Sequence, residues 1–310
     1  HACVMTARSH NITCIGFERG YNGVLDNKYR VLDESTVKHI SHLGGTILRS
    51  ARCLRLLEVE NQRLAADNLN SLGLDALIVI GGDGSFRGAL AIAEHNSLPI
   101  IGIPATIDND VDDCDHTLGF QTAVQTATEA IDKIRDTADA LERIFIVEVM
   151  GRHSGFIALD VGIATEAEQI IYPELGLTAN SLFAHLKHDI QHYMAHQGHA
   201  SYIIVMAENS IQDHTAASLA ANLESELGVE CRALVLGHIQ RGGQASSQDR
   251  ILASKLGYYA VESLLQGYKR HMVSQLNGQL HLTELALSVK QAKALDIELY
   301  KYFQRSLMRG

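Results

Sequence analysis

Short apolar runs alternate with longer amphipathic stretches along this chain. Each short run has five to seven residues, is rich in β-branched side chains and is apolar on both faces, which is typical of strands buried inside a parallel sheet. We therefore predict strands at residues 12–17, 75–80, 99–103, 143–149, 202–207 and 232–236.

The stretches between these runs have apolar residues three or four positions apart, so they predict amphipathic helices. The predicted helices cover residues 60–72, 87–94, 121–138, 181–196, 215–227 and 247–266. Alternating strands and helices indicate an α/β fold with right-handed crossovers. Because ligands of such folds bind beyond the carboxyl ends of the strands, the residues after each strand are the first candidates for a site.

The composition excludes several classes of protein. A chain of 310 residues with 46% hydrophobic residues can bury one large core or two ordinary ones. Its formal net charge of −10 argues against a general nucleic-acid-binding or anionic-membrane surface. Its 5 scattered cysteines form no C-x-x-C pair, which indicates a reducing compartment and neither a disulfide framework nor a zinc site. No apolar stretch approaches the roughly 18 residues of a membrane span.

The first candidate turn is Gly81-Gly82-Asp83-Gly84-Ser85, between a predicted strand and a helical pattern. Its glycines leave backbone N–H groups open to a phosphate, and a helix N-terminus adds a favourable field. Asp83 would be placed to reach a magnesium ion that bridges the phosphates. The alternative interpretation is a tight strand–helix turn with a capping Ser or Asp.

The second candidate turn is Thr106-Ile107-Asp108-Asn109-Asp110. Two carboxylates at positions i and i+2 of an extended segment point in different directions. One can then accept a hydroxyl proton while the other helps to hold a metal ion. The alternative is an acidic loop with Asx turns, an interpretation that the acidic run from Asp110 to Asp115 keeps open.

Two further glycine-rich turns carry cations. Met150-Gly151-Arg152-His153 follows one predicted strand, and Gly237-His238-Ile239-Gln240-Arg241-Gly242-Gly243 follows another. Arginine at such positions suits phosphate oxygens, although His238 alone reads as a packed histidine and Arg241 alone as a surface ion pair. Four turns of this kind, each after a strand, favour one composite phosphate site.

Taken together, these four segments resemble 6-phosphofructokinase. The connecting segments 44–52 and 130–137 share the resemblance, which runs in order from about Gly16 to Leu282. It implies two Rossmann-like three-layer α/β domains with mostly parallel sheets. The larger, nucleotide-binding domain would comprise residues 1–119 plus 240–290, and the smaller, sugar-phosphate domain residues 120–239 plus 291–310.

The resemblance implies phosphoryl transfer from MgATP to the 1-hydroxyl of fructose 6-phosphate, a step of glycolysis in the cytoplasm. Asp108 matches the catalytic base, Thr106 and Asp110 its neighbours in the sugar and magnesium region, Asp83 the magnesium carboxylate, and Arg152 the arginine that stabilises the transferring phosphoryl group. Substrate-binding positions are matched by Asp110, Arg143, Met150, Gly151, Glu208, Arg232, His238 and Arg241. Nucleotide-binding positions are matched by Tyr21, Arg52, Cys53, Gly82, Gly84, Ser85 and Gly88.

The resemblance also implies self-association. Arg143 and Arg232 match arginines that reach the sugar phosphate from a neighbouring subunit, so a homotetramer is expected. The phosphoryl donor is expected to be ATP, because Gly84 and the small Ala105 stand where pyrophosphate-using members tend to carry Asp and Lys. A pyrophosphate-dependent enzyme and a non-catalytic sugar-phosphate-binding regulatory subunit are the alternatives.

Two departures from the family pattern lead to expectations of their own. Family members begin with a strand and a glycine-rich phosphate loop that this sequence does not contain, so we expect a segment to be missing before His1. In the effector site of regulated members, cationic positions align here with His1, Met5, Glu34 and residues 196–199, while Arg135 and Glu174 persist. Because few cations remain to hold a diphosphate, we expect little or no activation by ADP.

Overall fold

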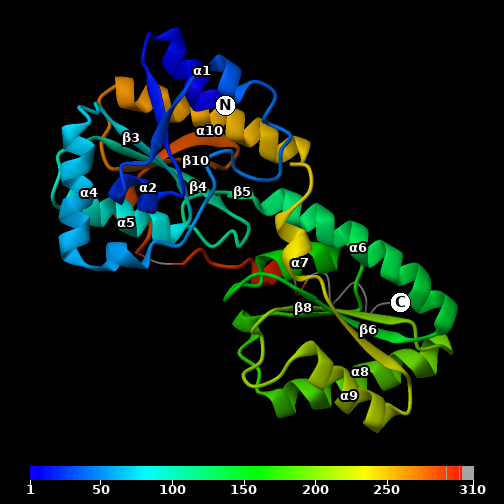
Figure 1. The fold of residues 1–310 in the computed structure, drawn as a ribbon. Coiled ribbons are helices and arrows are strands. Elements are labelled where there is room, and N and C mark those ends of the chain that lie inside the picture. The colour runs from blue at the N-terminus through cyan, green and yellow to red at the C-terminus, as the bar shows by residue number, and fades with distance from the viewer. Residues whose placement is uncertain (291, 300, 302–310) are drawn as a thin grey trace. The chain divides into compact units, whose positions relative to one another are not determined.

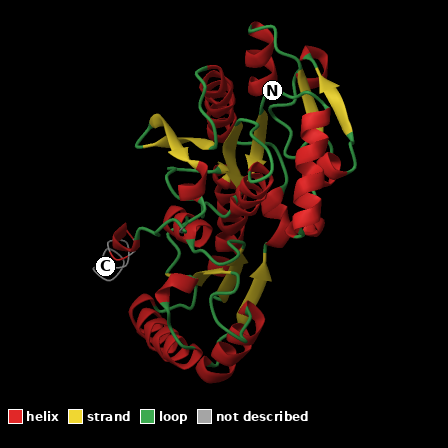
Figure 2. Cartoon of the chain, turned by 90° about the vertical axis from the view of Figure 1, so that its left-hand side faces the viewer, coloured by secondary structure: helices red, strands yellow, loops and turns green. Residues whose placement is uncertain are grey.

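The computed structural model describes residues 1–290, 292–299 and 301, so part of the predicted stretch 291–310 lies outside the described residues. The chain forms two compact units. The first unit comprises residues 1–106, 111–119 and 243–293. The second comprises residues 107–110, 120–242 and the described part of 294–310. Both contain helices and strands in alternation (Figures 1 and 2).

The first unit is built on a five-stranded sheet with the order β11-β10-β4-β3 and with β5 beside β4. β3, β5 and β10 run parallel to β4, and β11 is antiparallel to β10. A separate pair, β1 and β2, is antiparallel. The elements of this unit are α1 (Ala2–Ser9), β1 (Cys14–Phe17), α2 (Tyr21–Leu25), β2 (Tyr29–Leu32), α3 (Glu34–Val37), η1 (Leu54–Leu57), α4 (Val59–Ser71), β3 (Leu77–Gly81), α5 (Asp83–Ala93), β4 (Ile100–Thr106), β5 (Leu118–Gly119), α10 (Ser247–Leu265), β10 (His271–Leu276), β11 (Gln279–Glu284) and α11 (Leu285–Ser288).

Helices cover both faces of this sheet because β4 is apolar on both sides. Ile100 packs in a buried cluster with Phe86 and Ala89 of α5. Ile101 and its neighbours on the other face pack against Leu256 and the adjoining turns of α10. The result is the three-layer arrangement of helix, sheet and helix.

The second unit has a four-stranded, wholly parallel sheet with the order β7-β8-β6-β9. α6 and α7 pack on one face of it and α8 and α9 on the other. Its strands are in register, so that the turns after β6, β8 and β9 share one edge. The elements are α6 (Phe120–Leu141), β6 (Ile144–Val149), α7 (Phe156–Ala164), β7 (Gln169–Ile171), η2 (Pro173–Leu175), α8 (Ala179–Gln197), β8 (Tyr202–Ala207), α9 (Ala216–Leu227), β9 (Cys231–Val235) and η3 (Gly237–Arg241).

The α/β class with mostly parallel sheets is confirmed, but three of the strands predicted to be interior, β1, β3 and β9, are not interior strands. β1 pairs antiparallel with β2 outside the main sheet and is only partly buried. β9 is an edge strand of its sheet, with Val235 64% exposed, and β3 is an edge strand of the other sheet, with Ile80 60% exposed. Short apolar runs do not distinguish an interior strand from an edge strand, because that difference depends on which other segments pair with them.

Nothing in the described part of the chain forms a helix with both the length and the apolar character needed to cross a membrane. All five cysteines are free thiols, and burial raises the pKa of the Cys114 thiol to about 12. A thiol with so high a pKa is unreactive near neutral pH, in keeping with its role as a small buried side chain.

Candidate functional site

The turn 107–110 places Asp108 in a nearly buried position. β4 ends at Thr106, whose carbonyl accepts the Thr117 hydroxyl at 2.6 Å. Asp108 is 7% exposed, and its carbonyl accepts the buried Ser154 hydroxyl at 3.0 Å. The neighbouring Asn109 has a φ of +53°, in the left-handed region that asparagine tolerates better than most residues. The turn is thus tied to the segment that follows β6.

That segment, Met150 to Ser154, has an unusual backbone. Gly151 has a φ of +156°, and a Cβ there would lie 2.4 Å from the carbonyl oxygen of Ser154. Arg152 has a φ of +59°, which is uncommon for a long side chain and costs on the order of 1–3 kcal/mol. Strained residues held by their surroundings often occur at functional sites, and Arg152 presents an exposed guanidinium here.

Glu208, just after β8, holds this strained turn. Its Oε1 accepts the backbone N–H groups of Gly151 at 3.3 Å and of Arg152 at 2.8 Å. The next residue, Asn209, donates from its side chain to the Arg152 carbonyl at 2.9 Å. Two neighbouring strand ends therefore fix the backbone from which the Arg152 side chain extends.

The fourth predicted turn is the 3-10 helix η3. Its buried Gln240 bonds the backbone of Met150, and Arg241 Nε lies 3.4 Å from Met150 Sδ. His238 and Arg241 are exposed. The turns 107–110, 150–154 and 237–242 thus belong to the second unit, while the turn 81–85 belongs to the first unit.

The charges around Asp108 shift its protonation equilibrium. Burial is the largest cause and raises the pKa of this carboxyl, and the negative charge of Asp110 raises it further. Arg241 and Arg152 lower the pKa, and Glu208 raises it, without reversing the direction. A carboxylate with a raised pKa is a stronger proton acceptor than an ordinary aspartate, provided that it stays ionised.

In the first unit, the turn 81–85 opens α5. Gly82 is the N-cap residue, and Asp83 begins the helix with an ion pair to Arg87 at 3.0 Å. Tyr21 packs on this turn: its hydroxyl donates to the Ser85 carbonyl, and its ring lies 2.8 Å from where a Cβ of Gly88 would stand. Three predicted nucleotide-binding residues (Tyr21, Ser85 and Gly88) therefore lie together.

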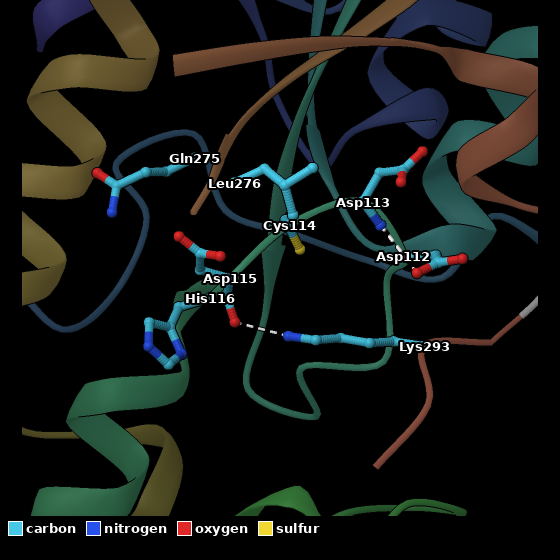
Figure 3. Close-up of a pocket in the computed structure, with 8 residues that line it drawn as sticks. All are labelled: Asp112, Asp113, Cys114, Asp115, His116, Gln275, Leu276 and Lys293. Atoms are coloured by element: carbon cyan, nitrogen blue, oxygen red, sulfur yellow. Dashed lines mark hydrogen bonds between the residues drawn. The ribbon is translucent and has the colours of Figure 1, made fainter. Parts of the chain in front are cut away.

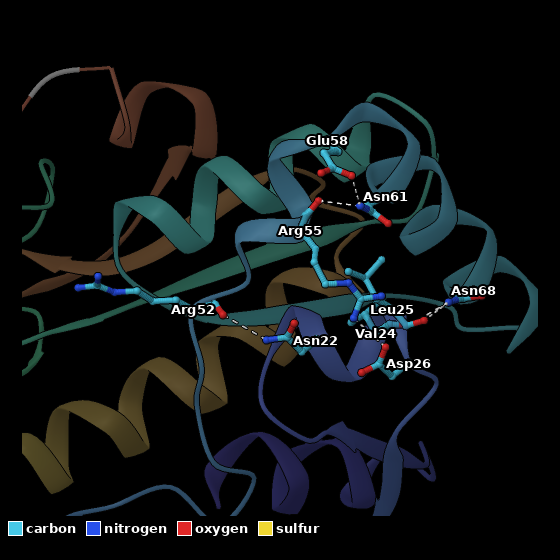
Figure 4. Close-up of polar contacts among 9 residues, drawn as sticks. All are labelled: Asn22, Val24, Leu25, Asp26, Arg52, Arg55, Glu58, Asn61 and Asn68. Atoms are coloured by element: carbon cyan, nitrogen blue, oxygen red, sulfur yellow. Dashed lines mark hydrogen bonds and ion pairs between the residues drawn. The ribbon is translucent and has the colours of Figure 1, made fainter.

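Arg52 and Cys53 precede η1 in the same unit. The Arg52 carbonyl accepts the side-chain amide of Asn22 at 3.3 Å, while its exposed guanidinium extends away from these contacts (Figure 4). Nearby, Arg55 forms an ion pair with Asp26 at 2.9 Å. The backbone before η1 is thus fastened to α2, and the Arg52 side chain is left exposed.

Arg143 and Arg232 lie where the strands of the second unit's sheet begin, at the end opposite the candidate turns. Arg143 directly precedes β6, whereas Arg152 follows it, and a strand of six residues spans about 20 Å. Both arginines pair with Glu230, Arg143 through Nε at 2.5 Å. The second unit of a single chain therefore does not bring them to Arg152 and Arg241.

The acidic run after Asp110 has local structural partners. Asp115 accepts the backbone N–H groups of Asn277 at 2.8 Å and Gly278 at 2.9 Å, so it holds the β10–β11 turn. Its carbonyl accepts Lys293 Nζ at 2.6 Å (Figure 3). Asp115 and Lys293 are among the residues that line a pocket of about 520 Å³, and their hydrogen bonds hold the loop in place. Here the interpretation as a turn-rich acidic loop applies.

Sequence reasoning singled out neither Ser154 nor Gln240. Both are buried polar residues, 7% and 1% exposed, that hydrogen-bond across two turns. Each lies inside a quoted motif or next to one. The feature of the sequence that could have identified them is a polar residue among glycines directly after a strand.

Comparison with known proteins adds independent evidence. The family profile described as Phosphofructokinase matches residues 1–264. The chain is 43% identical over 303 residues to the ATP-dependent 6-phosphofructokinase 1 of Thermus thermophilus, covering 98% of this chain and 92% of that protein. It is also 43% identical to the ATP-dependent 6-phosphofructokinase of Bacillus subtilis, covering 90% of this chain and 85% of that protein.

A solved structure agrees with these sequence matches. The phosphofructokinase structure from Saccharomyces cerevisiae superposes with a TM-score of 0.88 at 31% identity, covering 97% of this chain and 47% of that one. With the family profile matching most of the chain and relatives above 40% identity along nearly their whole length, this chain belongs to the phosphofructokinase family.

Proposed function

We propose that this chain is an ATP-dependent 6-phosphofructokinase of glycolysis, which phosphorylates the 1-hydroxyl of fructose 6-phosphate. The observation that carries the proposal is Asp108, a nearly buried carboxylate whose pKa responds to Arg152 and Arg241. A base beside two cations is what phosphoryl transfer to an alcohol requires, because the reaction depends on positioning and charge neutralisation.

In the proposed mechanism, Asp108 accepts the proton of the sugar 1-hydroxyl as that oxygen attacks the γ-phosphorus, the bond from this phosphorus to the bridging oxygen breaks, and ADP leaves. Burial favours this transfer, since the carboxylate becomes neutral on accepting the proton. Arg152 stabilises the charge on the transferring phosphoryl group. The backbone N–H groups of Gly151 and Arg152 donate to Glu208, and these hydrogen bonds hold the arginine in position. Thr106, at the end of β4, and Asp110 complete the proposed catalytic neighbourhood.

The sugar phosphate would be held by His238 and Arg241, with Met150, Gly151 and Glu208 lining the sugar. Arg143 and Arg232 lie at the far edge of the same sheet. We propose that they serve the site of a second copy in a homotetramer. An interface of that kind would make each sugar-phosphate site incomplete in an isolated chain.

The nucleotide is assigned to the first unit. Gly82, Gly84, Ser85 and Gly88 would approach the phosphates through their backbone, and Tyr21, Arg52 and Cys53 would surround the remainder of the nucleotide. Space around Gly84 is open, because a Cβ there would meet nothing within 4 Å. Glycine has no side chain to block the nucleotide here, whereas pyrophosphate-using members tend to carry Asp at this position. Gly84 therefore supports ATP over pyrophosphate as the donor.

The carboxylates Asp83 and Asp110 suit Mg²⁺, which prefers oxygen ligands. No group of three or more His, Cys, Asp or Glu side chains within the described ranges could hold a metal ion. We propose that the ion arrives with the nucleotide, because Mg²⁺ in kinases usually takes one or two carboxylates plus phosphate oxygens and water. Bound there, Mg²⁺ would neutralise charge on the phosphates. A cytoplasmic location is part of the same proposal, in line with the five free thiols.

A donor comparison tests this function. The purified chain is assayed with fructose 6-phosphate and either MgATP or magnesium pyrophosphate, and we expect turnover with MgATP. Gly84→Asp should lower activity with MgATP at least about tenfold by like-charge repulsion, with little loss of stability because the position is open. Turnover with pyrophosphate alone would replace the proposal by the pyrophosphate-dependent alternative. Binding of the sugar without turnover would favour the regulatory subunit.

A further inference from the structure

Gln240 is a buried side chain in the turn that carries His238 and Arg241. It is 1% exposed, and its carboxamide is bonded on both sides. Oε1 accepts the backbone N–H of Met150 at 3.3 Å, and Nε2 donates to the carbonyl of Gly237 at 3.1 Å. One side chain therefore links the turn after β9 to the turn after β6.

The position of this carboxamide follows from the way β9 leaves the sheet. The ladder between β6 and β9 ends where Leu236 donates its N–H to the Glu148 carbonyl at 3.0 Å. In a parallel ladder the next bond would run from the Met150 N–H to the Leu236 carbonyl. The backbone instead turns at Gly237, with a φ of +53°, and the Met150 N–H is bonded by Gln240.

A carboxamide has the same donor and acceptor as a peptide group, so Gln240 replaces one peptide unit of the ladder. This lets η3 turn out of the sheet, with exposed His238 and Arg241, while the buried Met150 keeps a hydrogen bond. An apolar side chain at position 240 would leave that N–H without an acceptor unless one turn moved. The contact of Arg241 with Met150 Sδ involves a weak acceptor and does not substitute for it.

We propose that Gln240 is a positioning residue, which fixes the spacing between the Met150–Arg152 turn and the His238–Arg241 turn and so sets the affinity for the sugar phosphate. The effect on substrate rests on the proposed function, whereas the effect on the Met150 backbone does not. The expected consequence is a change in binding more than in the chemical step, because Asp108 and Arg152 keep their own supports.

The test compares Gln240→Met with Gln169→Met. Gln169 is also a buried glutamine of the second unit, 7% exposed, and its Nε2 donates to Asp189 at 2.7 Å. It begins β7, which is the outer strand of the sheet on the side away from β9. Gln240→Met should raise KM for fructose 6-phosphate about tenfold, with kcat within about threefold and KM for ATP unchanged. Gln169→Met should leave all three unchanged. Equal effects on KM for fructose 6-phosphate, or none from Gln240→Met, would overturn the proposal.

A conservative variant provides a rescue. In Gln240→Glu, a protonated carboxyl offers the same donor and acceptor as the amide, whereas the ionised form lacks the donor. Relative to the wild type at each pH, KM for fructose 6-phosphate should be closer to normal at pH 6 than at pH 8. A Glu variant that behaves like the Met variant at both values contradicts the peptide-replacement role.

Hydrogen exchange separates this proposal from the proposed function, because it is measured without substrate. The Met150 amide should exchange at least about tenfold faster in Gln240→Met than in the wild type or in Gln169→Met. Unchanged exchange at Met150 would overturn the positioning role even in an active kinase. A wild-type chain that does not phosphorylate fructose 6-phosphate would overturn the function, and the exchange experiment would still decide the role of Gln240.

Discussion

Asp108 shows how one residue can serve the reaction and weaken the fold. Burial and the charge of Asp110 raise the pKa of its carboxyl in the folded chain. Folding therefore favours the protonated form, and its stabilising contribution is lost as the pH rises through the folded-state pKa. Near neutral pH the ionised side chain is needed as a base and is at the same time unfavourable for folding.

We therefore predict opposite effects of Asp108→Asn on activity and stability. Turnover should fall by about 100-fold or more, because asparagine cannot accept the hydroxyl proton. The thermal midpoint at pH 7.5 should rise by roughly 2 °C, because a neutral amide replaces a buried charge. Steady-state kinetics and calorimetry measure the two effects.

The pH dependence provides the control for this prediction. The stability difference between Asp108→Asn and the wild type should shrink as the pH falls through the raised pKa of Asp108, since the wild-type carboxyl becomes neutral there. A difference that grows on acidification, or an Asn variant with normal turnover, would contradict both the pKa argument and the catalytic role.

Arg135 is the residue for which the structure adds most to the sequence. The resemblance places it among effector-site positions, yet its guanidinium pairs with the half-buried Glu168 at 2.6 Å and donates to the carbonyls of Thr165 and Glu166. Glu168 in turn accepts the Ile203 N–H at 2.7 Å. These contacts give Arg135 a structural role in holding α6 to the loop after α7, and Glu168 holds that loop to β8.

Arg135→Ala should consequently lower the free energy of unfolding by about 1–3 kcal/mol, because Glu168 would lose a charged partner. We expect weak or no activation of the wild type by ADP, and the variant should not change that response. Urea unfolding and ADP titrations of the kinase reaction check the two statements. Strong ADP activation that disappears in the variant would show that this arginine serves an effector instead.

Among the elements, those with a strong local pattern were predicted well. β8 is buried along its whole length and was expected at the residues where it occurs. α7 was missed because it is apolar almost all round and shows no amphipathic period. The β10–β11 hairpin was missed although Asn277-Gly278, both with positive φ, is a typical two-residue hairpin turn.

Helix ends are also set by local interactions, and the N-terminus of α9 allows the contribution of one cap to stability to be measured. Thr215 accepts the Ser218 N–H at 3.2 Å, and Ser218 Oγ accepts the Thr215 N–H at 2.9 Å, which forms a reciprocal capping box. Thr215→Ala should lower the free energy of unfolding by about 1 kcal/mol. Thr215→Ser keeps the acceptor and should cost much less. Equal losses in urea unfolding would show that the methyl group, and not the cap, is what matters.

At the scale of the whole molecule, the question is which chain's site Arg143 and Arg232 serve. The residues that suit a sugar phosphate lie at both ends of the parallel strands of one sheet. Arg152 and Arg241 follow the carboxyl ends of the strands, whereas Arg143 and Arg232 lie where the strands begin. No pattern within one chain specifies which surface of a second copy meets these arginines. The homotetramer is accordingly a proposal that needs a test of shared sites.

Mixing two inactive variants provides that test. The Asp108→Asn chain keeps its arginines, and the Arg143→Ala/Arg232→Ala chain keeps its base. If each site takes its base from one chain and its arginines from the other, hybrids contain one intact site for every pair of chains. Random pairing should then restore about a quarter of wild-type activity after the two variants are dissociated and reassembled together. Each variant reassembled alone should stay inactive, which controls for recovery by refolding. Mixtures that are no more active than the separate variants would mean that Arg143 and Arg232 act within their own chain or not at all.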